Sequence, residues 1–178
     1  MAEVGCLKDG HFQNLLVEAR TSLSGGHLNT VVLSGGGTTV LTAANSGATC
    51  VFDSDAASNF TLPAPELGMR FTFITVAPNT ATVADHVIQA ATNDQGFLGG
   101  VISASTTASK ADTFAADADG SNDFITLNKT DSGGDPGTRI EVVALADASA
   151  PVTPWGVSGQ IACDISGATV TPFGDSQL

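Results

Sequence analysis

Short apolar runs separated by turn residues follow one another along the chain from Asn29 onward. Most of the runs alternate apolar and polar positions, which is the period of a β-strand. The segments between them are rich in Gly, Pro, Asn and Asp, the residues that favour tight turns. The pattern predicts strands at 30–33, 38–42, 49–52, 60–62, 71–76, 86–90, 98–103, 124–127, 139–145, 155–161 and 169–173.

Many short strands at this spacing are typical of an all-β fold rather than of alternating strands and helices. We expect an antiparallel β-sandwich, jelly-roll-like or barrel-like, over residues 29–178. Residues 1–28 differ, because Phe12, Leu15 and Leu16 have rough helical spacing before a Ser-Gly-Gly stop. We interpret 1–28 as an N-terminal arm or a short helix that packs on the body or on a neighbour. The Ser/Thr/Ala-rich stretch at 104–111 is interpreted as low complexity.

The strand at 71–76 predicts an interaction surface. Pro63, Pro65 and Gly68 read as a corner before it, because proline cannot donate to a central ladder. Alternation then places Phe71 and Phe73 in the core, while the opposite face begins polar and ends with two aliphatic residues. A strand that is apolar on both faces needs cover from a loop, an arm or another subunit. The candidate contact residues are therefore Ile74 and Val76, with Phe12, Leu15 and Leu16 of the arm.

Charge excludes several classes of partner. The chain has 18 acidic and 6 basic residues, a net charge of −12, and its few bases are scattered. Binding to nucleic acid requires clustered Lys and Arg, so we expect no nucleic-acid partner, and anionic membranes are disfavoured for the same reason. Charged residues make up only 13% of the chain, so Ser, Thr, Asn and Gly must supply most of the polar surface.

No catalytic motif is recognisable, so we expect neither enzymatic activity nor a cofactor. The glycine run at 35–37 lacks the rest of a dinucleotide or P-loop motif, and no GxSxG elbow occurs. Asp85-His86 is interpreted as a turn carboxylate before a partly buried histidine rather than half of a catalytic triad. Cys6, Cys50 and Cys163 have no metal-ligand spacing and are interpreted as reduced structural thiols.

One acidic segment could hold a hard cation. Asp117, Asp119 and Asp123 surround a glycine, and such alternating oxygen ligands suit calcium. The EF-hand pattern would place a glutamate at position 128, where Asn128 stands, and the glycine has the wrong offset. A solvated turn therefore accounts for this segment better than a metal site.

Three blocks of sequence resemble small β-rich virion proteins of tailed bacteriophages, above all marine ones. The first is LTAANSG at 41–47 with the strand 49–52, and the second is TLP at 61–63 with GMRFTF at 68–73. The third combines FITL at 124–127, GTRIEV at 137–142 and WGVSG at 155–159. The order of these blocks is similar to that in capsid decoration, or cement, proteins and in head-fibre or tail-fibre modules.

The resemblance implies a structural virion protein on the outer capsid surface. Such proteins are typically β-rich homotrimers that bind the major capsid protein at three-fold positions and stabilise the shell. The alternative that it leaves open is a head-fibre or tail-fibre module that binds host surface glycans. A glycan hydrolase fits less well, because the paired carboxylates lie in turn-like segments with no apolar pocket signal to raise one pKa.

Overall fold

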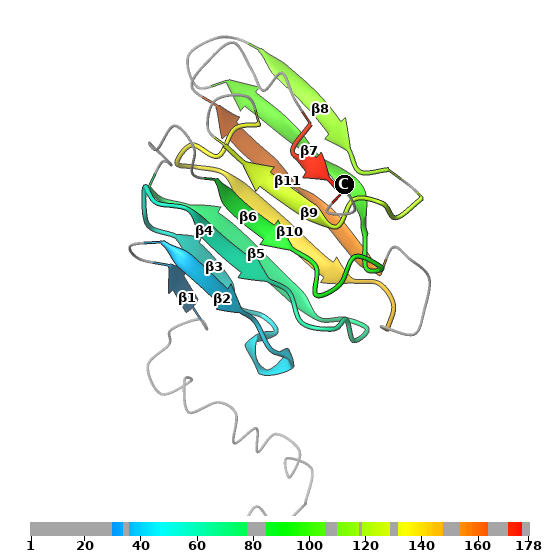
Figure 1. Ribbon diagram of the computed structural model, residues 1–178. Helices are drawn as coiled ribbons and strands as arrows, with labels where there is room; N and C mark the ends of the chain where they lie inside the picture. The colour runs from blue at the N-terminus through cyan, green and yellow to red at the C-terminus, as the bar shows by residue number, and fades with distance from the viewer. Residues whose placement is uncertain are drawn as a thin grey trace, which may run out of the picture.

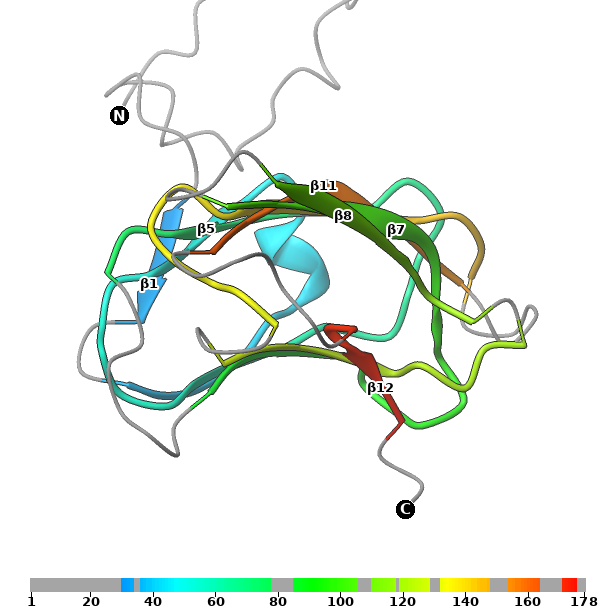
Figure 2. The same ribbon diagram turned by 90° about the horizontal axis from the view of Figure 1, so that it is seen from above.

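The computed structural model of the chain describes residues 30–33, 36–77, 85–105, 110–117, 119–128, 132–147, 154–163 and 171–175. Nearly all regular structure in these residues is β-strand, arranged in two sheets (Figure 1). Viewed from above, the sheets form two layers that face each other (Figure 2). The all-β sandwich expected from the pattern is confirmed.

Seven strands form one sheet and five form the other. The larger sheet has the order β1 (Thr30–Leu33), β3 (Thr49–Phe52), β5 (Arg70–Thr75), β10 (Arg139–Ala144), β11 (Trp155–Cys163), β7 (Phe97–Ser105) and β8 (Ala111–Ala115). The smaller sheet has the order β12 (Phe173–Gly174), β9 (Phe124–Leu127), β6 (His86–Gln89), β4 (Ser58–Thr61) and β2 (Gly37–Val40). A short 3₁₀ helix, η3 (Ala43–Asn45), joins β2 to β3. In the described part of the chain, no helix is long and apolar enough to cross a membrane.

The first six strands wind as a short solenoid. Odd-numbered strands add to the seven-stranded sheet and even-numbered strands to the five-stranded sheet, so the chain passes between the layers at every step. All neighbours within this part are parallel: β1 with β3, β3 with β5, β2 with β4, and β4 with β6. The strand register places identical residues side by side on neighbouring strands: Thr30 lies opposite Thr49, and Thr49 lies opposite Thr72.

Two late strands interrupt this winding. After β6 the chain returns to the seven-stranded sheet as β7, but β10 and β11 lie between β7 and β5. β10 pairs antiparallel with both β5 and β11, whereas β11 pairs parallel with β7. The centre of the larger sheet is therefore assembled from segments that are far apart in the sequence.

The structure corrects the expected strand pairing. The sandwich is not purely antiparallel, because both of its sheets are mixed. The physical reason is that consecutive strands of the solenoid cross to the opposite layer instead of forming hairpins within one sheet. β8 was not predicted, since its segment begins within the Ser/Thr/Ala-rich stretch and its residues are mostly exposed or partly buried. The expected arm, residues 1–28, lies outside the described residues.

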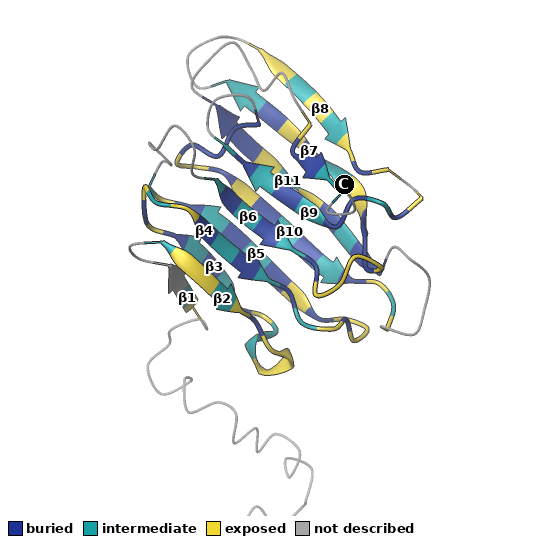
Figure 3. Cartoon of the chain, in the orientation of Figure 1, coloured by how far each residue is buried: buried dark blue, intermediate teal, exposed yellow. Residues whose placement is uncertain are grey.

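An aromatic cluster joins the two layers. Phe52 and Phe73 come from the seven-stranded sheet, and Phe60 and His86 come from the five-stranded sheet. The ring centroid of Phe52 lies 5.0 Å from that of Phe60, 6.5 Å from that of Phe73 and 4.6 Å from that of His86. Figure 3 shows the resulting alternation of buried and partly exposed positions along the strands. Trp155 is fully buried beside Phe71, as the strand pattern predicts.

The proline corner before β5 forms as expected and is fastened to β10. Gly68 has a φ of 86°, a conformation that favours glycine, and its amide donates to the carbonyl of Ala144 at 2.9 Å. The amide of Leu67 donates to the carboxylate of Asp147 at 2.7 Å. In the strand that follows the corner, Phe71 and Phe73 are buried in the core and Arg70 is exposed.

Candidate functional site

The predicted contact residues of β5 lie on the outer face of the seven-stranded sheet. Ile74 is partly buried and lies opposite Val51 of β3 on one side and Arg139 of β10 on the other. Val76 lies just beyond the end of β5 and is 49% exposed. We call Val51, Ile74 and Val76 the aliphatic patch. Phe12, Leu15 and Leu16 fall outside the described residues, so their place relative to the patch stays a prediction.

The surface beside the patch is polar and open. Arg139 and Glu141 of β10 lie opposite Gln160 and Ser158 of β11. These four side chains line a shallow hollow of about 390 Å³ with Gly137 and Gly159. The outer face of this sheet thus offers aliphatic, hydroxyl, amide and charged groups side by side. Such a mixture suits contact with another protein surface, because interfaces combine an apolar centre with hydrogen-bonding groups.

The three carboxylates of the acidic segment differ in burial and in hydrogen bonding. Asp117 is exposed and its amide donates to the side-chain carbonyl of Asn122 at 2.6 Å, whereas Asp123 is buried. The carboxylate of Asp119 accepts from the amide of Ser121 at 3.0 Å, and this hydrogen bond is the main reason why the pKa of Asp119 is lowered. Among the described residues, no group of three His, Cys, Asp or Glu side chains could hold a metal ion. The Asp119 carboxylate and the Asn122 side chain accept hydrogen bonds from backbone amides, as side chains do in a turn.

His86 is fully buried between the layers and stacks on Phe52 with an interplanar angle of 14°. Burial lowers the pKa of His86, although the carbonyls of Ala77 and Ser54 and the carboxylate of Asp85 favour the charged form. Neither ring nitrogen reaches a partner at full hydrogen-bond geometry. His86 is therefore a neutral core residue, more deeply buried than the sequence suggested.

We expect acid to destabilise the fold through His86. Its pKa is below 6.5 in the folded state, so as pH falls the unfolded chain binds the proton first and the free energy of unfolding decreases. This stability is present above pH 6.5 and is lost as pH falls through the folded pKa. In urea titrations between about pH 7 and about pH 5, His86→Leu should show a flatter pH dependence than the natural chain. Parallel curves for the two proteins would contradict this role.

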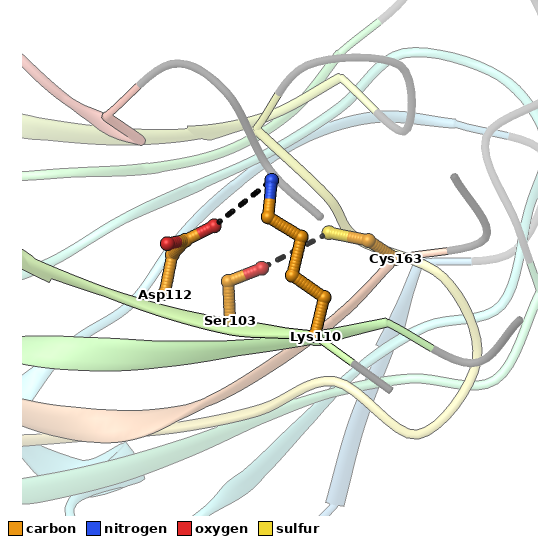
Figure 4. Close-up of polar contacts among 4 residues, drawn as sticks. All are labelled: Ser103, Lys110, Asp112 and Cys163. Carbon is orange, nitrogen blue, oxygen red and sulfur yellow. Dashed lines mark hydrogen bonds and ion pairs between the residues drawn. The ribbon is translucent and has the colours of Figure 1, made fainter. Parts of the chain in front are cut away.

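The described cysteines are structural. Burial raises the pKa of the Cys50 thiol to about 12, so it is protonated at neutral pH and is a poor nucleophile. Cys163 lies at the end of β11, where its sulfur is 3.3 Å from the hydroxyl of Ser103 on the neighbouring strand β7 (Figure 4).

The ion pair between Lys110 and Asp112, drawn in the same view, spans 3.7 Å between side chains that are 50% and 43% exposed. Such an exposed pair contributes little to stability.

The five-stranded sheet carries a second polar surface that sequence reasoning missed. Asn59 of β4, Gln89 of β6 and Phe124 of β9 lie on its outer face, as the alternating burial of these strands shows. The alternation of residues along β6 and β9 could have indicated this surface. It was misleading, because His86 faces the core and Phe124 faces outward.

Comparisons with known proteins do not assign either surface. Searches of family models, of curated proteins and of solved structures found no match.

Proposed function

We propose that this chain is a structural virion protein that decorates and stabilises a phage capsid. In this role it binds the major capsid protein as a homotrimer at three-fold positions on the outer capsid surface, and it acts without catalysis. The outer face of the seven-stranded sheet makes the capsid contact. The aliphatic patch contributes most of the binding free energy.

One observation carries the proposal. Most of the sequence blocks that resemble phage virion proteins come together in space, although they are spread over the chain. They form four consecutive strands of the larger sheet, in the order β3, β5, β10 and β11. The outer face of these strands holds the aliphatic patch and the polar hollow beside it. The similarity is thus concentrated in the sheet whose outer face we assign to the capsid contact.

The physical character of this face supports the same role. Ile74 is itself partly buried beside partly buried Val51, so it loses less side-chain entropy on binding than a fully exposed side chain would. The hydroxyl and amide groups around the patch can hydrogen-bond to water in the free protein. On binding, they exchange these bonds for hydrogen bonds to the capsid. A net charge of −12 disfavours contact with the nucleic acid inside a particle and suits the outer surface.

We expect Ile74→Asp to reduce capsid occupancy by about tenfold or more, because it places a charge in the apolar part of the contact. Capsids that lack the protein are incubated with the purified full chain, sedimented and analysed by quantitative gel densitometry. Val40→Asp is the matched control, since Val40 is an exposed aliphatic residue on β2 of the other sheet. Equal occupancy for the two variants would contradict the assigned face.

The copy number tests the role itself. Quantitative mass spectrometry of purified virions should give a ratio near one copy per major capsid protein. A few copies per particle would contradict decoration and favour a fibre module. Light scattering of the isolated chain tests the trimer separately.

A further inference from the structure

The outer face of the five-stranded sheet contains a trough. Two hollows of about 350 Å³ and 280 Å³ adjoin there, and Asn59 and Val87 line both of them. They form one open depression across β4, β6 and β9. We call it the sheet trough, and its principal residues are Asn59, Asp85, Val87, Gln89, Phe124 and Thr126.

Phe124 gives the sheet trough an aromatic wall. A Cβ atom at Gly174 of β12 would lie only 2.3 Å from two carbon atoms of the Phe124 ring, so the ring fills the space that a side chain would occupy there. The glycine thus supports the ring from one side, and the ring borders the trough. An aromatic ring fixed in this way, beside aliphatic Val87, can pack against the C–H groups of a sugar ring.

Two amide side chains form the polar part of the sheet trough. The Nδ2 of Asn59 donates to the Oε1 of Gln89 at 3.2 Å, which holds the two amides together on neighbouring strands. The Oδ1 of Asn59 is covered and accepts no hydrogen bond. A sugar hydroxyl cannot reach this covered oxygen while the amide pair is intact, so binding uses the amide hydrogens of the pair. Thr126 adds a further hydroxyl group on β9.

We propose that the sheet trough binds a neutral saccharide. An aromatic and aliphatic wall beside planar amides and a hydroxyl matches the alternating C–H and O–H groups of a pyranose ring. The one charged side chain that lines the trough, among the described residues, is the carboxylate of Asp85, and the whole chain carries a charge of −12. Both repel sialic and uronic acids, so anionic saccharides are disfavoured.

The binding is weak for a single site and gains strength from repetition. An open trough buries only one side of a sugar, and a Kd of about 1 mM is typical of so few contacts. The trough faces away from the aliphatic patch, because the two lie on the outer faces of opposite sheets. A capsid covered with this protein would therefore display many troughs outward, and avidity would raise the effective affinity for a glycan-bearing surface. Only this display depends on the proposed decoration role; binding by the isolated chain does not.

Nuclear magnetic resonance tests the site directly. The ¹⁵N-labelled full chain is titrated to about 20 mM with glucose, galactose, mannose, maltotetraose and cellotetraose, a range that covers a millimolar Kd. At least one neutral sugar should shift the side-chain amide signals of Asn59 and Gln89 and the backbone signals of Val87 and Thr126. Glucuronic acid at the same concentration should not. If none of these sugars shifts the trough signals, or if the acid shifts them equally, the proposal is wrong.

Matched variants then separate the trough from the rest of the surface. Phe124→Leu keeps an apolar side chain but removes the flat ring, and Gln89→Met keeps the length of the side chain but removes its amide. Each should weaken binding by about tenfold. Ile102→Ala is the control, because Ile102 is 52% exposed on β7 of the other sheet. Binding that survives both trough variants would overturn the assignment, whereas capsid decoration would be unaffected by that result.

Discussion

Phe52→Ala should destabilise the protein by about 3–5 kcal/mol, a large part of the about 5–15 kcal/mol that stabilises a typical domain. Phe52 is fully buried and its ring contacts those of Phe60, Phe73 and His86 from both sheets. Removing it leaves a cavity at the point where the layers meet, and strands on both sides would have to move together to fill it. Equilibrium unfolding in urea, followed by tryptophan fluorescence of the buried Trp155, measures the loss.

The control for this variant is Val40→Ala. Val40 is 67% exposed at the end of the edge strand β2, so its truncation should change the free energy of unfolding by no more than about 0.5 kcal/mol. Phe52→Leu should lie between the two, because it retains most of the apolar volume. If Phe52→Ala and Val40→Ala lost similar stability, the aromatic cluster would not be the junction of the layers.

Gly99→Ala should also be strongly destabilising, because β7 and β11 approach too closely at this point for a side chain. Gly99 has a φ of 116°, and a Cβ atom there would lie 2.2 Å from the carbonyl oxygen of Val157. Since the clash is with backbone, relief requires the two longest strands of the sandwich to separate. We expect a loss of about 2 kcal/mol or more beyond the effect of the backbone conformation alone.

Gly37→Ala isolates the conformational part. Gly37 has a φ of 112°, nearly that of Gly99, but a Cβ atom there would have no neighbour within 4 Å. Its substitution should therefore carry only the strain of an unfavourable φ, about 1–3 kcal/mol. Equal losses for the two variants in the same urea titration would show that the close approach of β7 and β11 is unimportant.

The positions of most strands could be predicted from the sequence, because they depend on local alternation. The strands at 30–33, 49–52 and 124–127 were predicted with the bounds that the structure has. Local pattern also placed Phe71, Phe73 and Trp155 in the core. It failed for β8, whose residues alternate between exposed and partly buried positions and carry little apolar signal. Pairing failed as well, because alternation specifies the faces of a strand but not its neighbours.

Of the two candidate surfaces, one could be predicted from local sequence and the other could not. Ile74 and Val76 were predicted as surface contacts because a strand that is apolar on both faces is visible in the sequence alone. The sheet trough was not predicted, because its residues come from three separate strands, β4, β6 and β9. They become neighbours only through the strand register, which places Asn59 and Thr126 on either side of Val87. The support of Phe124 by Gly174 likewise joins residues about fifty positions apart.

By itself the sequence determined that this protein is all-β, uncharged over much of its surface, acidic overall and built from short strands separated by turns. These properties follow from composition and from contacts between near neighbours. Only the tertiary structure decided that the first strands wind as a solenoid, that β10 and β11 enter between β5 and β7, and that two distinct outer faces result. The reason is that strand order is selected by the packing of distant side chains, above all the aromatic rings between the layers, and no local pattern encodes that choice.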